Sequence, residues 1–103
     1  MEGINCGSKT YFFGTFADDI ICGSEEKDVI FSFGGNDCID SAGGDDKVFA
    51  GFGHDIVDLG LGDDKAFGGP GDDEINGNDG SDVIFGGFGF DTCVGESVLF
   101  CEQ

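Results

Sequence analysis

Residues 68–76 read GGPGDDEIN, and residues 77–85 continue without a gap as GNDGSDVIF. Both segments have glycine at positions one and four, aspartate at position six and isoleucine at position eight. The same nine-residue frame extends back to Gly14 and forward to Val94 without insertion or deletion, so it covers nine consecutive units. A fixed period of this kind is typical of a solenoid, in which each unit packs only against its neighbours.

Two positions of the frame keep their chemistry through the whole run. Position six is aspartate in every unit: Asp19, Asp28, Asp37, Asp46, Asp55, Asp64, Asp73, Asp82 and Asp91. Position eight is apolar in every unit: Ile21, Ile30, Ile39, Val48, Val57, Ala66, Ile75, Ile84 and Cys93. We expect position eight to face the interior. Ala66 is the small residue of this column, and Ala66→Val is predicted to stabilise the fold unless the opposite sheet already fills the space.

The frame resembles the repeat-in-toxin (RTX) nonapeptide GGxGxDxUx, a hemolysin-type calcium-binding repeat in which U is a large aliphatic residue. The resemblance covers residues 14–94, which is nearly the whole chain. It implies an all-β fold, a right-handed parallel β-roll in which each nonapeptide supplies one calcium-binding turn and one short strand. Two nonapeptides then complete one coil.

The resemblance also implies calcium ions held between aspartates on the same edge of the roll. Calcium takes six to eight oxygen ligands, and glycine-rich turns let main-chain carbonyl groups converge on it. Aspartates eighteen residues apart form seven pairs: Asp19 with Asp37, Asp28 with Asp46, Asp37 with Asp55, Asp46 with Asp64, Asp55 with Asp73, Asp64 with Asp82, and Asp73 with Asp91. The alternative is a column of turn-forming aspartates without ions, which would place like charges roughly 5 Å apart.

The charge balance narrows the function further. The chain has 22 acidic and 4 basic residues, which gives a formal net charge of −18. Seven calcium ions carry 14 positive charges and would leave about −4, which removes most of the self-repulsion. Four basic residues are too few for the positive face that nucleic acid requires, so no nucleic-acid partner is expected. No apolar run approaches the roughly 20 residues of a membrane span.

Glycine content adds a second reason to expect folding on calcium binding. The chain has 21 glycines, and glycine loses more conformational freedom on folding than any other residue. Calcium binding is therefore expected to offset both the charge repulsion and the entropy of ordering the backbone.

The five cysteines favour an oxidising compartment, and we predict an extracellular, secreted protein. No signal peptide is visible at the N-terminus, so a mature or recombinant form is expected. The predicted disulfides are Cys6–Cys22 and Cys93–Cys101, with Cys38 left free. The connectivity stays open, because sequence alone does not determine it.

The frame divides the chain into an N-terminal cap at 1–13, nine repeats at 14–94 and a C-terminal cap at 95–103, all in one domain. Caps are expected because the open ends of a solenoid expose apolar core and unpaired strands. In the first two units Ala17 and Glu26 replace the position-four glycine. Side chains disfavour positive φ, so we expect these two turns to be irregular and the best-formed sites to lie toward the C-terminus.

No catalytic constellation accompanies the repeat, and we predict no enzymatic activity. The EF-hand pattern fails because Val83 stands where the loop requires glutamate. His54 is the single histidine and is interpreted as a solvated loop residue. Every repeat aspartate is accounted for by the frame, and no insertion interrupts it to form a pocket.

One feature goes beyond the repeat. Position nine is phenylalanine in every second unit, and the frame extends this to the N-terminal cap: Phe13, Phe31, Phe49, Phe67 and Phe85. Strand alternation predicts that these rings form a ladder on the outer face of one sheet. The ladder either stabilises the sheet by stacking or forms an exposed stripe for self-association through Phe31, Phe49, Phe67 and Phe85.

Three classes of function therefore remain open. The first is a calcium-binding β-roll, and the second is a structural or adhesive module that self-associates or binds a surface through its phenylalanine ladder. The third is a segment that serves the secretion and folding of a larger enzyme or toxin, against which the two predicted caps argue.

Overall fold

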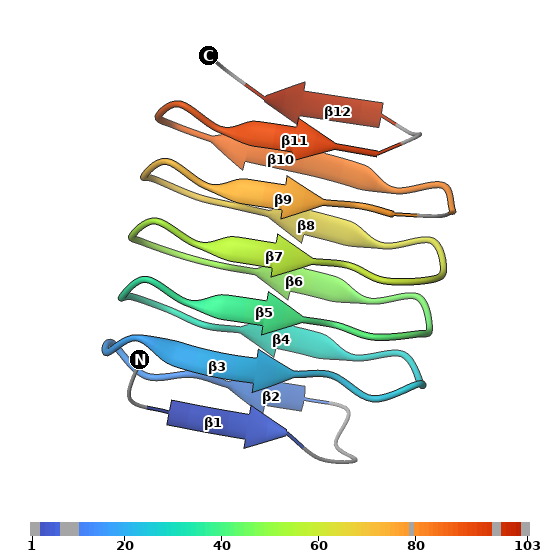
Figure 1. The fold of residues 1–103 in the computed structure, drawn as a ribbon, viewed down its shortest axis with the longest axis horizontal. Coiled ribbons are helices and arrows are strands. Elements are labelled where there is room, and N and C mark those ends of the chain that lie inside the picture. Colours follow the sequence, from blue (N-terminus) through green and yellow to red (C-terminus); the bar gives the residue numbers. More distant parts are fainter. Residues whose placement is uncertain (1–2, 7–10, 79, 96–97, 102–103) are drawn as a thin grey trace.

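The computed structural model describes residues 3–6, 11–78, 80–95 and 98–101. Within them the chain forms strands and no helix, and the strands build stacked coils with one sheet on each side (Figure 1). The predicted all-β parallel solenoid is confirmed. No helix in the described part of the chain is long and apolar enough to cross a membrane.

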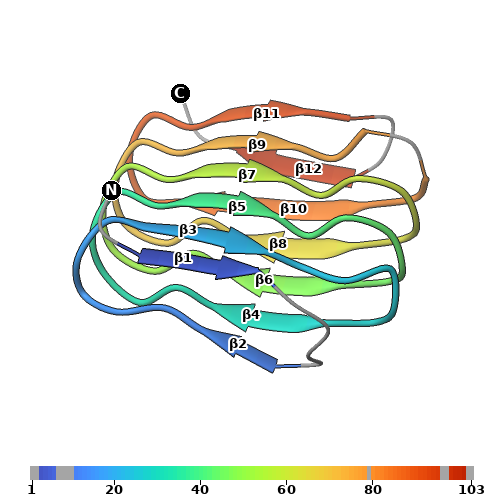
Figure 2. The same ribbon diagram turned by 60° about the horizontal axis from the view of Figure 1, so that its bottom comes forward.

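Two parallel six-stranded sheets face each other, and the chain alternates between them (Figure 2). Sheet A contains β1 (Gly3–Cys6), β3 (Asp19–Cys22), β5 (Cys38–Asp40), β7 (Ile56–Asp58), β9 (Glu74–Asn76) and β11 (Thr92–Val94). Sheet B contains β2 (Tyr11–Phe13), β4 (Val29–Phe31), β6 (Lys47–Phe49), β8 (Lys65–Phe67), β10 (Val83–Gly87) and β12 (Val98–Cys101).

The strand register shows that two units make one coil. Val57 in β7 lies opposite Ile75 in β9, and Val48 in β6 lies opposite Ala66 in β8. Each pair is eighteen residues apart, so equivalent positions of alternate units stack directly above one another. The same residue type recurring every nine positions therefore becomes two straight columns, one on each side of the roll.

The core is made mainly by position eight, whose side chains point inward from both sheets. Its residues from Ile21 to Ile84 are at most 3% exposed, and Cys93 packs against them. A second set of core residues comes from position one, where Ala50 and Leu59 are fully buried. The frame alone did not indicate this contribution of position one to the core, because position one is glycine in most units.

The turns approach each other so closely that they require glycine. Gly71 has φ +111°, and a Cβ added there would lie 2.1 Å from the carbonyl oxygen of Gly53 in the coil below. Position two also has positive φ in seven of the nine units, including the non-glycine residues Phe33, Ala42 and Asn78. The first two units have no positive φ at positions two or four, so their turns have a different backbone conformation.

The two ends of the roll continue the sheets with a changed register. Gly3 in β1 lies opposite Asp19, an offset of sixteen residues. Val98 in β12 lies opposite Val83, an offset of fifteen, and the pairing shifts between Phe85 and Gly87. Parts of both predicted caps lie outside the described residues: 1–2 and 7–10 at the N-terminus, and 96–97 and 102–103 at the C-terminus. The cap boundaries therefore stay a prediction.

Candidate metal sites at the edges of the roll

All nine repeat aspartates lie at the edges of the roll, where a turn enters the next strand. Each is buried, with an exposed fraction of at most 3%. Successive units alternate between the edges, so Asp37, Asp55 and Asp73 stack on one edge while Asp46 and Asp64 stack on the other. Burial of nine carboxyl groups in so small a protein is expensive unless each is hydrogen-bonded or holds a cation.

One oxygen of seven of the nine carboxylates joins neighbouring coils. The amide of an aspartate donates a hydrogen bond of 2.7–2.9 Å to Oδ1 of the aspartate eighteen residues later. The bonds join Asp19 to Asp37, Asp28 to Asp46, Asp37 to Asp55, Asp46 to Asp64, Asp55 to Asp73, Asp64 to Asp82 and Asp73 to Asp91. These are the seven pairs that the sequence predicts, and the structure brings each of them together.

The second oxygen of the carboxylates in the middle coils has no hydrogen-bond donor. Oδ2 of Asp37, Asp46, Asp55, Asp64 and Asp73 is buried without a partner. Leaving a buried polar atom unsatisfied costs about 1–3 kcal/mol, and more for a charged one. Five orphaned acceptors in two stacked columns therefore fit a set of bound cations.

Burial also shifts the acid–base chemistry of these groups in the metal-free roll. It raises the pKa of Asp55 from 3.8 to about 8. It likewise raises the pKa of Asp46, Asp64 and Asp73 to about 7 and that of Asp37 above its ordinary value. Removal from water disfavours the charged carboxylate, and the neighbouring aspartates add repulsion. A cation would reverse this shift by stabilising the ionised form.

The first two aspartates are held differently. Oδ2 of Asp19 accepts a hydrogen bond from the amide of Thr15 at 2.6 Å, and the Thr15 hydroxyl also contacts this carboxylate. Ser24 makes the equivalent bonds to Asp28 through its amide and hydroxyl. In these two units, position two is threonine or serine and does not have positive φ. The amide and hydroxyl of that residue donate hydrogen bonds to the carboxylate of the same turn.

Main-chain oxygens would have to complete any cation site. Among the described residues, no group of three or more His, Cys, Asp or Glu side chains converges as metal ligands would. Carbonyl groups are available at the turns, however. A Cβ added to Gly68 would lie 2.6 Å from both Oδ2 of Asp73 and the carbonyl oxygen of Gly86. In the unit of Asp73, glycine at position one therefore keeps open the space toward which a carboxylate and a carbonyl oxygen converge, and oxygen donors of this kind suit calcium. In the units of Asp37, Asp46, Asp55 and Asp64 this position is Ser32, Ser41, Ala50 and Leu59.

Three overlapping segments, 13–48, 42–66 and 59–93, match the model of the RTX calcium-binding nonapeptide repeat family. The chain belongs to this family. The matched RTX segments together contain all nine repeat aspartates, and the predicted resemblance is confirmed. No curated protein and no solved structure matches the chain.

This RTX roll has another ladder that sequence reasoning missed. At position five, amides donate to the side chain of the residue eighteen positions earlier: Asn36 to Asp18, His54 to Asn36, Asp72 to Nδ1 of His54 and Phe90 to Asp72. His54 is exposed, as expected of a loop residue, but its ring also joins two coils. The sequence did carry a signal for this ladder, because Asp18, Asn36, His54 and Asp72 place a hydrogen-bond acceptor at position five of four alternate units.

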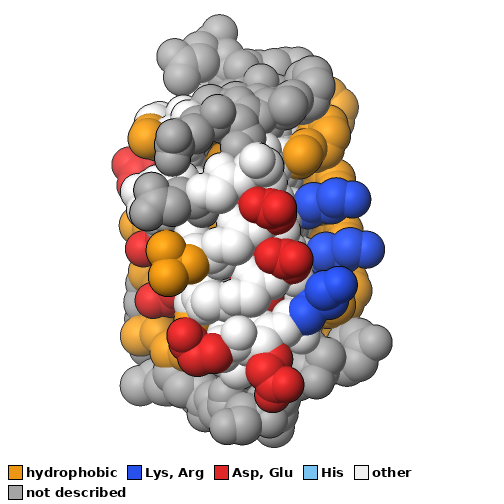
Figure 3. All heavy atoms as spheres, turned by 90° about the vertical axis from the view of Figure 1, so that its right-hand side faces the viewer, with side chains coloured by type: hydrophobic (Ala, Val, Ile, Leu, Met, Phe, Trp, Pro, Cys, Tyr) orange, Lys and Arg blue, Asp and Glu red, His pale blue; other side chains and the backbone are white. Residues whose placement is uncertain are grey.

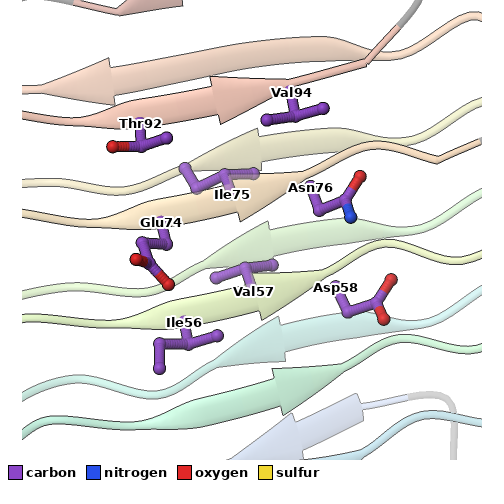
Figure 4. A pocket seen from close by; sticks show the side chains of 8 residues that line it. All are labelled: Ile56, Val57, Asp58, Glu74, Ile75, Asn76, Thr92 and Val94. Carbon is purple, nitrogen blue, oxygen red and sulfur yellow. The ribbon is translucent and has the colours of Figure 1, made fainter.

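The outer face of sheet A has a shallow hollow that does not include the orphaned carboxylates. Position-seven and position-nine side chains flank it in two columns (Figure 4). Its lining residues are Ile56, Val57, Asp58, Glu74, Ile75, Asn76, Thr92 and Val94. The candidate metal sites thus lie at the turns, away from this sheet surface.

The phenylalanine ladder lies on the outer face of sheet B, as predicted. Neighbouring rings of Phe13, Phe31, Phe49, Phe67 and Phe85 stack with centroids 4.9–5.6 Å apart and interplanar angles of 3–8°. Most ring faces therefore contact another ring, and stacking stabilises the sheet. Lys47 and Lys65 form the adjacent column on the same strands.

Proposed function

We propose that this chain is a calcium-binding RTX roll whose buried aspartates hold ions between consecutive coils. The observation that carries the proposal is the orphaned Oδ2 of each middle aspartate, as at Asp55 and Asp73. A divalent cation would supply the missing partner and the charge that burial disfavours. Calcium fits better than magnesium because it accepts more oxygen ligands in a less regular geometry.

About seven ions correspond to the seven aspartate pairs. The proposed ligands are the nine aspartates of position six, together with carbonyl oxygens of the glycine turns. The well-formed sites begin with the pair Asp37 and Asp55, since Asp19 and Asp28 already receive hydrogen bonds from Thr15 and Ser24. We expect the sites that involve these first two units to bind more weakly.

Calcium binding and folding should be coupled in this protein. Without ions the roll would bury carboxylates that prefer to be hydrated or protonated, and it would carry a formal charge of −18. Ion binding to the folded state alone stabilises that state by mass action. The unfolded chain lacks the stacked turns, so it has no equivalent sites.

Secretion and disulfide formation belong to the same proposal. Cys6 and Cys22 are register partners on β1 and β3. Adjacent strands place such partners about 4.8 Å apart, within the Cα spacing of a disulfide. The proposed second bridge joins Cys93 in β11 to Cys101 in β12. Cys38 carries a free thiol. Outside the cell, calcium in the medium would fill the proposed sites.

The role is proposed to be binding and structural rather than enzymatic. The RTX family is defined by a calcium-binding repeat, and the buried aspartates are accounted for as stacked pairs. The carboxylates of the sheet A hollow, Asp58 and Glu74, lie on the outer sheet face (Figure 4).

Calcium titration of chelated protein tests the proposal. Circular dichroism should show a gain of β structure, and equilibrium dialysis should count about seven ions at saturation. Magnesium at the same concentration is the matched control and should restore little structure. A spectrum that stays unchanged through chelation, or equal folding in both ions, would show that specific calcium coordination does not hold the roll together.

A further inference from the structure

The two edges of the roll have the same backbone design but different side chains. Three of the five turns that lead from sheet B to sheet A carry an exposed phenylalanine at position three, namely Phe16, Phe52 and Phe88. Gly34 and Pro70 occupy this position in the two turns between them. The opposite turns carry Glu25, Gly43 and Leu61 at the equivalent described positions. That opposite edge displays acidic side chains beside a row of lysines (Figure 3). The asymmetry is not needed for the coiled backbone, which is the same on both edges.

Other rings widen this strip, which we call the aromatic edge. Its exposed members are Phe13, Phe16, Phe33, Phe52, Phe85, Phe88 and Phe90. The ring of Phe33 lies 6.0 Å from that of Phe16 and 6.4 Å from that of Phe31. The aromatic edge is therefore continuous with the ladder on sheet B.

The rings at the turns leave more surface open than the middle rings of the ladder, whose end members Phe13 and Phe85 also belong to the aromatic edge. Ladder rings such as Phe49 and Phe67 stack face to face and are only partly exposed. Phe16 and Phe88, by contrast, are 81% and 77% exposed. The turn tips rather than the ladder therefore present most of the unused aromatic surface.

The amount of exposed aromatic surface is large for so small a protein. The seven rings are between 37% and 81% exposed, which at about 200 Å² per ring amounts to roughly 850 Å². The accessible surface of the protein is 5364 Å², so these rings together supply about a sixth of it. A standard protein interface buries about 800 Å² on each partner, so this strip is large enough for one partner protein.

We propose that the aromatic edge is the contact surface between two copies of this chain. A second copy supplies a matching strip, since the same coil spacing sets the length of both strips and a two-fold axis brings like surfaces together. Aromatic residues are enriched in such interface cores. The inference rests on the proposed function only in that calcium keeps the roll folded and lowers its charge.

A lipid surface is the competing occupant, and the charge disfavours it. With seven calcium ions bound, the formal charge of −18 would fall to about −4, which an anionic bilayer still repels. The lysines that could offset this lie elsewhere: Lys27, Lys47 and Lys65 line a hollow with Asp45 and Asp63 toward the charged edge. They do not rim the turn tips that carry Phe16 and Phe88.

Analytical ultracentrifugation in saturating calcium tests the proposal. Wild type should sediment as a dimer and dissociate on dilution. The triple variant Phe16→Ser, Phe52→Ser, Phe88→Ser should be monomeric, or should show a dissociation constant at least tenfold higher. Leu61→Ser is the matched control: it removes the exposed apolar residue from the same turn position on the opposite edge and should leave the dimer intact.

Circular dichroism separates a failure of folding from a failure of association. Each variant should keep the calcium-dependent β signal of wild type, because the replaced rings are exposed. If the triple variant does not fold, hydrogen exchange of wild type at low and high concentration replaces it. Residues 14–18, 50–54 and 86–90 should then gain protection at high concentration, while 23–27 and 59–63 should not.

The proposal is overturned if folded wild type stays monomeric at about 100 μM, because the dissociation constant of any dimer would then lie well above that concentration. It is equally overturned if the triple variant dimerises like wild type, or if the assembly is larger than a dimer. Flotation with phosphatidylcholine vesicles forms the last arm. A monomer that binds these vesicles through the same three phenylalanines would assign the aromatic edge to lipid instead.

Discussion

The amide of Asp55 donates a hydrogen bond of 2.8 Å to Oδ1 of Asp73, although the two residues are eighteen positions apart. The other oxygen of Asp73 is buried and has no donor. The two oxygens of this carboxylate therefore have different surroundings: Oδ1 joins consecutive coils, and Oδ2, which has no donor, is the proposed calcium ligand. Substitutions that keep the interlayer hydrogen bond and remove the proposed ligand can therefore distinguish a structural aspartate from a calcium ligand.

We predict that Asp73→Asn weakens calcium binding far more than Asp19→Asn. The amide side chain retains an oxygen for the interlayer hydrogen bond but removes the negative charge. Asp73 belongs to two pairs, with Asp55 and with Asp91, so up to about two ions should be lost or bound at least tenfold more weakly. Equilibrium dialysis and calcium titration measure both effects.

Asp19→Asn is the matched control for that experiment. Its carboxylate accepts hydrogen bonds from Thr15 within its own turn, and it belongs to one pair only. We expect a loss of at most about one weak ion. Equal losses of stoichiometry in the two variants would contradict the division between the first two turns and the later ones.

Acidification should stabilise the calcium-free roll. Burial raises the pKa of Asp55 to about 8 and that of Asp64 to about 7, whereas an unfolded aspartate titrates near 3.8. The folded state therefore binds more protons than the unfolded state between pH 4 and 8, so stability falls as the pH rises through that range. In excess chelator, circular dichroism should show more β structure at pH 5.5 than at pH 8.5.

The calcium-loaded protein should respond in the opposite sense. Protons compete with calcium for the same carboxylates, so calcium affinity should fall as the pH drops below about 7. Titrations at pH 8.5, 7 and 5.5 measure this dependence. An affinity that is independent of pH would mean that the groups of raised pKa, Asp46, Asp55, Asp64 and Asp73, do not bind the ion.

We predict that Gly71→Ala destabilises the roll strongly. The added Cβ would lie 2.1 Å from the carbonyl oxygen of Gly53, at a φ of +111° that side chains rarely adopt. The expected cost is more than about 2 kcal/mol, measured by chemical denaturation in saturating calcium. Gly95→Ala is the control, since the nearest heavy atom would be 3.6 Å away, and its change should stay within about 0.5 kcal/mol.

The core allows a test of whether Leu59 fills the space beside Ala66. Both are buried in one cluster, and they belong to the unit that combines a large residue at position one with a small one at position eight. Leu59 follows β7 in sheet A, whereas Ala66 lies in β8 of sheet B. We now expect Ala66→Val to overpack the core and cost about 1 kcal/mol, rather than to stabilise it.

A double-mutant cycle provides the control for that interpretation. Leu59→Ala alone should cost about 2–4 kcal/mol, and the double variant with Ala66→Val should cost less than the sum of the two. Additive losses, or a stabilising Ala66→Val, would show that Leu59 does not fill the space beside Ala66.

The nine-residue period predicted a solenoid with a recurrent apolar position, whereas the resemblance to the RTX repeat implied the parallel roll, the eighteen-residue coil and the seven aspartate pairs. Once the length of one coil is known, a constant spacing in the sequence gives neighbours in space. The stacked phenylalanine ladder followed from the same argument. It needed only strand alternation and the length of one coil.

Other features required the folded chain, because they depend on how particular atoms meet across coils. The sequence does not show that Thr15 and Ser24 satisfy Asp19 and Asp28 while Asp55 and Asp73 keep an orphaned oxygen. That difference arises from turn backbone conformation, which a repeat pattern describes only loosely. Burial of Leu59 also depends on packing across the roll, where each side chain fills space that distant residues leave open.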